Sequence, residues 1–266
     1  MGVIFEAGYS LPGADQPLTN ARIAHAGTWY AGTPAASSTA TGYFAAAPNN
    51  SLTYELWKPA SVTATWELDL GSAVDVDYCC IAAHTMGTNG NSVQVQYYTG
   101  STWADLTPVT AVSDDMPIMC IFSTENAQRF RISITGGTAP TIGVIRFGEA
   151  MQMDAPIFSG HSPLDYGRIT ESRAAYSMSG AFLGRSKQRQ WLATSFEWTH
   201  LNKTWVEANW SAFQKAGYTE PFFIAWRPDD FSEVGYCQTE NVPAPQFMGV
   251  RAYMSVGLQV TALGYD

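Results

Sequence analysis

Alternating apolar and polar residues run through the first half of the chain and predict short β-strands. In the stretch 64–70, Trp66 and Leu68 fall on one face, while carboxylates fall on the other, as in a strand buried on one side. We expect Gly71 to end this strand. The strands expected in this half are 51–57, 64–70, 74–83, 92–99, 116–122, 128–135 and 141–149. Short strands bounded by turns, without a helical pattern between them, favour a sandwich or barrel.

From about residue 154 the pattern changes, and one helix is expected among strands. Residues 205–216 carry an apolar stripe at helical spacing. Thr204 and Glu207 have the spacing of a capping box, and Gly217 is the expected C-cap. The strands expected in this half are 170–179, 190–199, 222–226, 234–239 and 253–263.

These patterns divide the chain into three segments: an N-terminal arm at 1–20, a β-sandwich at 21–153, and a second β-sandwich with one helix at 154–266. Charge supports a boundary near residue 150. Residues 1–150 hold 5 basic and 12 acidic residues, a net charge of −7, whereas residues 151–266 hold 9 and 11, a net charge of −2.

Overall composition narrows the classes of function. The net charge of −9 argues against a nucleic-acid groove, which needs clustered Lys and Arg. No run of about eighteen apolar residues occurs, so we expect no membrane insertion. The first residues lack the basic and long apolar regions of a signal peptide.

The four cysteines are expected to be free thiols that serve as small core residues. Cys79 and Cys80 are adjacent on a predicted strand, so their side chains face opposite sides. Cys120 and Cys237 lie far from them in the sequence. A disulfide framework or metal cluster is the less favoured alternative.

Several stretches of residues 21–153 together resemble coagulation-factor type C (discoidin) domains. The stretches that carry the resemblance are Trp66 to Gly71, Val74 to Tyr78, Ser92 to Tyr98 with Trp103 after it, and Ala127 to Ile132. The resemblance implies a jelly-roll β-sandwich that binds sugars or lipid head groups through loops at one end. The terminal cysteine pair of many family members is absent. Residues 41–44 supply no carboxylate for the family's Ca²⁺ loop, so we expect no metal and no cofactor.

The resemblance places six residues in the expected ligand-binding loops. They are His25, Trp29, Tyr30, Tyr43, His84 and Asn89. Aromatic faces stack on sugars, and His or Asn binds their hydroxyls. The alternative is that Trp29 and Tyr30 pack on a neighbouring subunit or on the sandwich itself.

Nothing in the sequence predicts catalysis. The four histidines lack ligand spacing, and the carboxylate pairs Asp114–Asp115 and Asp229–Asp230 are more simply solvated loop charges. No nucleophile elbow, P-loop or dinucleotide fingerprint occurs. A glycan-cleaving enzyme is the minority hypothesis.

The second half contains candidate subunit contacts. Arg185, Lys187 and Arg189 alternate, so on an extended segment they would project from one side. They would meet the acidic surface of an adjacent copy, or form a solvated edge that blunts strand pairing. Five tryptophans fall within 36 residues, more than a small unit buries easily, and Trp210 among them is an expected interface residue.

A second resemblance concerns the end of the chain. Residues 222–228, 234–236 and 256–260, with their order of elements, resemble bacteriophage minor tail proteins. In that family a β-sandwich with one flanking helix, the distal-tail or tail-tube fold, forms a ring.

These observations predict a structural component of a bacteriophage tail tip or baseplate, made in the host cytoplasm and carrying an outward carbohydrate-binding-like module. The expected partners are copies of itself in a hexameric or trimeric ring and neighbouring tail proteins, with a host surface glycan as a further candidate. The alternative is a soluble carbohydrate-binding protein with an accessory β domain.

Overall fold

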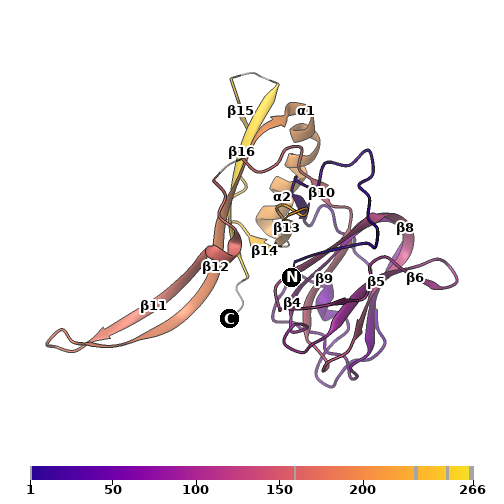
Figure 1. Ribbon diagram of the computed structural model, residues 1–266, viewed down its shortest axis with the longest axis horizontal. Coiled ribbons are helices and arrows are strands. Elements are labelled where there is room, and N and C mark those ends of the chain that lie inside the picture. Colours follow the sequence, from indigo (N-terminus) through magenta and orange to yellow (C-terminus); the bar gives the residue numbers. More distant parts are fainter. Residues whose placement is uncertain (1, 159, 231–232, 250–251, 264–266) are drawn as a thin grey trace.

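The computed structural model describes residues 2–158, 160–230, 233–249 and 252–263 (Figure 1). Over these residues the chain is mainly β, with two sheets, one α-helical segment and two short single-turn helices, so the predicted mainly β class with one α-helix is confirmed. The first sheet contains β1 (Val3–Phe5), β3 (Thr33–Ala36), β4 (Ala64–His84), β5 (Ser92–Tyr98), β6 (Trp103–Asp105), β7 (Thr110–Ala111), β8 (Ile118–Thr135) and β9 (Ile142–Gly148).

The second sheet begins with a strand from the N-terminal part of the chain. It contains β2 (Arg22–Ala24), β10 (Met151–Gln152), β11 (Arg168–Tyr176), β12 (Phe182–Asn202), β13 (Phe222–Ala225), β14 (Val234–Gln238), β15 (Gln246–Phe247) and β16 (Tyr253–Ala262). The helical elements are η1 (Ala47–Asn49), η2 (Leu164–Tyr166), α1 (Lys203–Trp205), η3 (Val206–Trp210) and α2 (Ser211–Thr219), and the last three follow one another without a break.

Two long strands, β4 and β8, pair along their length and form both layers of a sandwich. The first part of β4 pairs with β3, and the C-terminal part of β8 pairs with β5. The second part of β4 pairs with β9, and the N-terminal part of β8 pairs with β1. Apolar side chains of both layers, such as Trp66 and Phe147, share one core between them.

The strand boundaries in the sandwich differ from the prediction. Gly71 does not end a strand: β4 continues through it, with a positive φ of 77° and a register shift before Val74. A glycine adopts that backbone without a steric penalty, so the strand bends instead of stopping. Predicted strands 116–122 and 128–135 likewise form one strand, β8. Residues 51–57 form turns, with a single bridge from Trp57 to Ile142.

The sandwich packs directly on the second sheet. Side chains on the outer face of β4, β8 and β9, such as Tyr78, Cys80 and Val144, share an apolar layer with Phe223 and Tyr236 of the second sheet. The second part of β4 is therefore buried on both faces. Cys79 lies in the sandwich core and Cys80 in the layer between the sheets, so the predicted opposite orientation is confirmed.

The other face of the second sheet is covered by the helical segment (Figure 1), whose Trp210 and Phe213 pack with Trp198 of β12. Strands β2 and β10 hydrogen-bond in this sheet, although both fall inside the predicted first module. After β1 the chain thus crosses into the second sheet with β2 before it returns to build the rest of the sandwich. The boundaries at 21 and 153 stay a prediction.

The helical segment begins earlier and ends later than predicted. Its N-cap is Asn202, whose side chain accepts a hydrogen bond from the backbone N–H of Thr204 at 2.9 Å. The expected capping partner Glu207 pairs instead with Lys203 at 3.5 Å. Gly217 is not the C-cap, because the helix continues to Thr219.

A two-stranded ribbon extends away from the rest of the molecule (Figure 1). It consists of β11, the turn that follows it, and the first half of β12, and we call residues 168–191 the arm. β16 pairs with β12 only from Leu192 onward, and β11 is the last strand of its sheet. Nine residues of β11 at about 3.3 Å each give the arm a length of about 30 Å.

Candidate functional site

The six residues expected to bind a ligand do not form one site. His25, Trp29 and Tyr30 lie beside the C-terminal end of β9, where Trp29 bridges to Gly148 and the Tyr30 N–H donates to Phe147. His84 lies opposite Ile142, at the other end of β9. Six residues of strand, about 20 Å, separate the two groups. The prediction of a single loop cluster is wrong because the segment that carries His25 belongs to the second sheet.

Both histidines of this set are buried. The His25 Nδ1 accepts the N–H of Gly27 at 3.0 Å, and burial lowers the pKa of His25 to about 4. The His84 Nδ1 accepts the N–H of Met86, and its Nε2 donates to the Met116 carbonyl oxygen at 2.9 Å. Burial lowers the pKa of His84 to about 4. At neutral pH both rings are uncharged, and His84 makes its hydrogen bonds within the protein.

The remaining members of the set have local structural contacts. Trp29 lies under the guanidinium of Arg146, 4.7 Å from the ring centroid. The Asn89 amide donates to the Thr85 hydroxyl and the Ala139 carbonyl oxygen. Half-buried Tyr43 lies in the turn before Ala45, whose carbonyl oxygen accepts the Trp66 indole N–H. The alternative in which Trp29 packs on the sandwich is therefore the observed one.

An open cleft lies where the sandwich, the N-terminal segment and the helical segment meet. Its volume is about 490 Å³, within the range of ligand pockets. The N-terminal segment contributes Asp15 and Gln16, the loop after β2 contributes His25 and Tyr30, and the link from β9 to β10 contributes Glu149. Two of the predicted ligand residues, His25 and Tyr30, line the cleft, but sequence patterns could not reveal the whole site, because its walls come from four segments that are mostly far apart along the chain.

The helical wall of the cleft has a distinctive backbone. Trp205, Ala208, Asn209 and Ala212 line the cleft, and their spacing places them on one helical face. This wall includes the π-helical turn Val206–Trp210, a feature that occurs often at functional sites. The two alanines leave room beside the half-buried indole of Trp205.

The cleft carries negative charge. Asp15 and Glu149 line it, no described lining residue is a Lys or Arg, and the lining His25 is uncharged at neutral pH. The neighbouring Asp77 is buried and accepts the Ala150 N–H at 2.8 Å. Burial raises the pKa of Asp77 to about 7, Glu149 and Asp15 raise it further, and the hydrogen bond from Ala150 and the buried cation Arg22 oppose the rise. This electrostatic environment favours a cationic group in the cleft.

Of the three basic residues expected on one side, Arg185 and Lys187 share a face of the arm, because their partners Ala174 and Ser172 are two residues apart on β11, whereas Arg189 departs. Lys187 pairs opposite Ser172 and Arg189 opposite Glu171, with a bulge between the two pairs. Cross-strand partners share a face, and successive residues of β11 alternate, so Lys187 and Arg189 project from opposite faces. Arg189 forms an ion pair with Glu171 at 2.5 Å and lies over the Trp191 ring.

The outer end of the arm, residues 176–183, is apolar and exposed, and we call it the tip. Tyr176, Met178, Phe182 and Leu183 are exposed there, and the Tyr176 and Phe182 rings contact each other with centroids 5.7 Å apart. Arg173 and Arg185 lie just behind the tip, on opposite faces of the ribbon. Aromatic residues, methionine and arginine are the residue types enriched at protein interfaces.

Trp210 has a different place from the one predicted. Its side chain is fully buried between the helical segment and the second sheet, and its indole N–H donates to the Pro243 carbonyl oxygen at 3.2 Å. It is a core residue and offers no surface to another subunit. Trp205, one helical turn earlier, is the tryptophan of this helix that faces the cleft.

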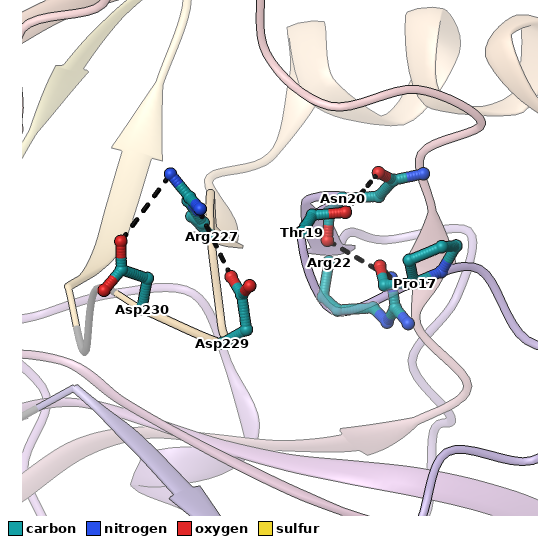
Figure 2. A network of polar contacts seen from close by, with 7 residues as sticks. All are labelled: Pro17, Thr19, Asn20, Arg22, Arg227, Asp229 and Asp230. Atoms are coloured by element: carbon teal, nitrogen blue, oxygen red, sulfur yellow. Dashed lines mark hydrogen bonds and ion pairs between the residues drawn. The ribbon is translucent and has the colours of Figure 1, made fainter.

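One of the two carboxylate pairs considered for catalysis, Asp229–Asp230, is held by a salt-bridge network (Figure 2). Arg227 contacts Asp229 at 3.3 Å and Asp230 at 3.6 Å. The Asp229 N–H donates to the Leu18 carbonyl oxygen, which attaches this loop to the N-terminal segment. Nearby, Arg22 donates to the carbonyl oxygen of Pro17 (Figure 2). Both carboxylates therefore have structural partners.

Two further classes of site are not seen in the described part of the chain. No three His, Cys, Asp or Glu side chains there gather closely enough to hold a metal ion. Among the described helices, none combines the length and apolarity that crossing a bilayer requires.

Comparison with known proteins gives structural neighbours but no family. No family model matches the sequence, and no curated protein matches it. Similar solved structures include a point mutant of chitosan-binding module 1, derived from a chitosanase/glucanase of Paenibacillus sp. IK-5. It has 16% identity over 47% of this chain and 99% of that one, at a TM-score of 0.40.

Two further neighbours come from Clostridium perfringens. CpGH89CBM32-5, in complex with GalNAc-β-1,3-galactose, has 10% identity over 44% of this chain and 94% of that one, at a TM-score of 0.40. The family 32 carbohydrate-binding module of NanJ, in complex with galactose, has 15% identity over 44% and 93%, also at 0.40. These neighbours are carbohydrate-binding modules that cover less than half of this chain. At such TM-scores they carry no argument about its function.

Proposed function

We propose that this protein is a structural subunit that assembles with copies of itself into a ring, and that the ring belongs to a bacteriophage tail tip or baseplate. The arm is the observation that carries this proposal. Both of its strands are exposed along nearly their whole length. An isolated two-stranded hairpin is marginally stable in water, and unpaired strand edges are templates for association. A partner would stabilise the arm.

Charge supports another copy of the same chain as that partner. Five basic residues and one acidic residue lie between 168 and 192, so this segment has a net charge of +4. The chain as a whole carries −9, which leaves −13 for the other residues. Two acidic proteins usually repel each other. Two copies of this chain can instead place the basic arm of one copy against the acidic remainder of the other.

Removing the arm tests self-assembly. In the test variant an Asn-Gly turn replaces residues 171–189, and it joins Thr170 to Gln190, which are cross-strand partners. Size-exclusion chromatography with light scattering should give an oligomer for the wild type and a monomer for the variant. The exposed-site variant Glu240→Gln is the matched control and should stay oligomeric. A wild type that remains monomeric at high concentration would contradict the proposal.

The tail context is the finer part of the proposal. The resemblance of residues 222–228, 234–236 and 256–260 to minor tail proteins supports it. The protein would be made in the host cytoplasm, join a hexameric or trimeric ring, and contact neighbouring tail proteins and a host glycan. Reading frames for tail-tube, tape-measure or hub proteins beside this gene would be expected. Their absence, with no such protein in purified virions, would count against a tail role.

A soluble carbohydrate-binding protein is the second candidate, and the cleft is the observation that favours it. Trp205 and Tyr30 offer aromatic faces there, and Gln16 and Asn209 offer amides, the groups that recognise sugars. This candidate predicts a stable monomer that binds a glycan. Trp205→Ala should abolish the glycan affinity, whereas the control Tyr218→Ala, on the exposed surface of the helix, should keep it. That result would favour this candidate over a ring.

A further inference from the structure

We propose that the tip of one copy's arm docks into the cleft of the next copy, an inference that rests on self-assembly as proposed above. Charge complementarity identifies the two surfaces. The tip is flanked by Arg173 and Arg185, whereas the cleft is lined by Asp15 and Glu149, with no Lys or Arg among its described lining residues. A guanidinium placed there would meet carboxylates and the faces of aromatic rings together.

The apolar parts of the two surfaces also match. The tip exposes Phe182 and Leu183, which would lose contact with water on docking. The helical wall of the cleft offers the half-buried indole of Trp205 beside Ala208 and Ala212, whose small side chains leave space for an incoming group. The tip therefore carries an apolar centre with cations behind it, and the cleft carries an apolar wall with carboxylates on two other walls.

The tip would reach the cleft of a second copy and not its own, because the arm leads away from the cleft of the same chain. β12 is fixed to β16 from Leu192 onward, and the arm extends to the side opposite the helical segment and the N-terminal segment (Figure 1). A contact between two different surfaces of identical copies is head-to-tail. Such contacts close into a ring when the rotation permits and otherwise extend into a filament.

A charge exchange tests the contact directly. One variant carries Asp15→Lys and Glu149→Lys, a second carries Arg173→Glu and Arg185→Glu, and a third carries all four substitutions. Each of the first two should weaken association about tenfold or more in light scattering, because like charges then face each other. The fourfold variant should regain association, since opposite charges again meet at every contact. Glu240→Lys, outside the cleft, is the control and should associate as the wild type does.

Cross-linking provides a second measurement that does not depend on the energetics. The four native cysteines are buried, so introduced thiols on the surface would dominate mild oxidation. A Glu149→Cys protein mixed with an Arg185→Cys or Arg173→Cys protein should give a disulfide-linked pair. A Glu240→Cys protein mixed with the same partners should not.

The outcomes separate this inference from the proposed function. If the wild type and both charge variants form the same oligomer while arm removal dissociates it, the arm docks elsewhere: the inference is wrong and self-assembly stands. Absence of cross-links with both arginine positions in an assembled sample would likewise overturn the inference alone. If the wild type does not associate at all, both proposals fail.

Discussion

Replacing Asp77 by asparagine should change how stability depends on pH. Asp77 lies in β4 beneath the link from β9 to β10, where its Oδ1 accepts the Ala150 N–H at 2.8 Å. Burial raises the pKa of this carboxyl from 3.8 to about 7. Asparagine keeps the acceptor oxygen for Ala150 and cannot ionise.

The sign and size of the effect follow from proton linkage. Because its folded-state pKa is raised, Asp77 holds its proton more tightly in the folded protein than in the unfolded chain. Its contribution is therefore greatest at low pH and is lost as the pH rises from 3.8 to about 7. Between pH 5 and 7 the loss covers two pH units, which corresponds to about 3 kcal/mol of unfolding free energy. Asp77→Asn should lack this loss.

Urea denaturation of both proteins at several pH values between 5 and 8 checks the prediction. The stability difference between Asp77→Asn and the wild type should shift in favour of the variant by about 3 kcal/mol over this range and then level off. Taking the difference between the two proteins removes the contributions of other titrating groups. Parallel pH profiles would refute the reasoning, because they would mean that Asp77 is ionised in the folded protein at pH 5.

The remaining predictions concern a buried histidine and the helix start. His84, with its pKa lowered to about 4, stabilises the fold above pH 6.5, and this stability is lost as the pH falls from 6.5 to about 4, by about 3 kcal/mol. His84→Gln should flatten the acid limb of the denaturation profile, and an unchanged limb would mean that the ring is solvated. Asn202→Ala should lower the unfolding free energy by about 1 kcal/mol through loss of the cap to Thr204. Asn202→Ser should retain most of the unfolding free energy that the cap contributes, because serine also caps helices. Equal losses in both variants would rule out capping as the cause.

Local pattern predicted the sandwich strands better than it predicted their boundaries. The strand around Trp66 and β5 were recognisable because side-chain alternation decides them, and β9 was recognisable as a short run between turn signals. The continuity of β4 through Gly71 could not be recognised from the sequence, because glycine permits both a chain reversal and a bend. Which one occurs depends on pairing with β8, a contact between segments about 60 residues apart.

The candidate sites show the same division. The sequence correctly placed Arg185 and Lys187 on one face of the arm, but the bulge between Lys187 and Arg189 turns Arg189 to the other face. Such a bulge depends on cross-strand register, which no local signal encodes. The second half also holds more tryptophans than a small unit buries easily. Trp210 is a core residue and Trp205 faces the cleft. The sequence could not distinguish them, because both lie on one helix and only its packing decides which face is buried.

The sequence by itself determined the β-rich class, the single helical segment, the free cysteines on opposite faces of a strand and the acidic character of the chain, because each depends on composition or on one short period. Only the tertiary structure decided that β2 and β10 join the second sheet, that the arm stands free, and that Asp15, Glu149 and Trp205 line one cleft. These features bring together segments that are mostly far apart along the chain. Their arrangement is fixed by which apolar faces are buried against each other, and that choice is made by the whole chain.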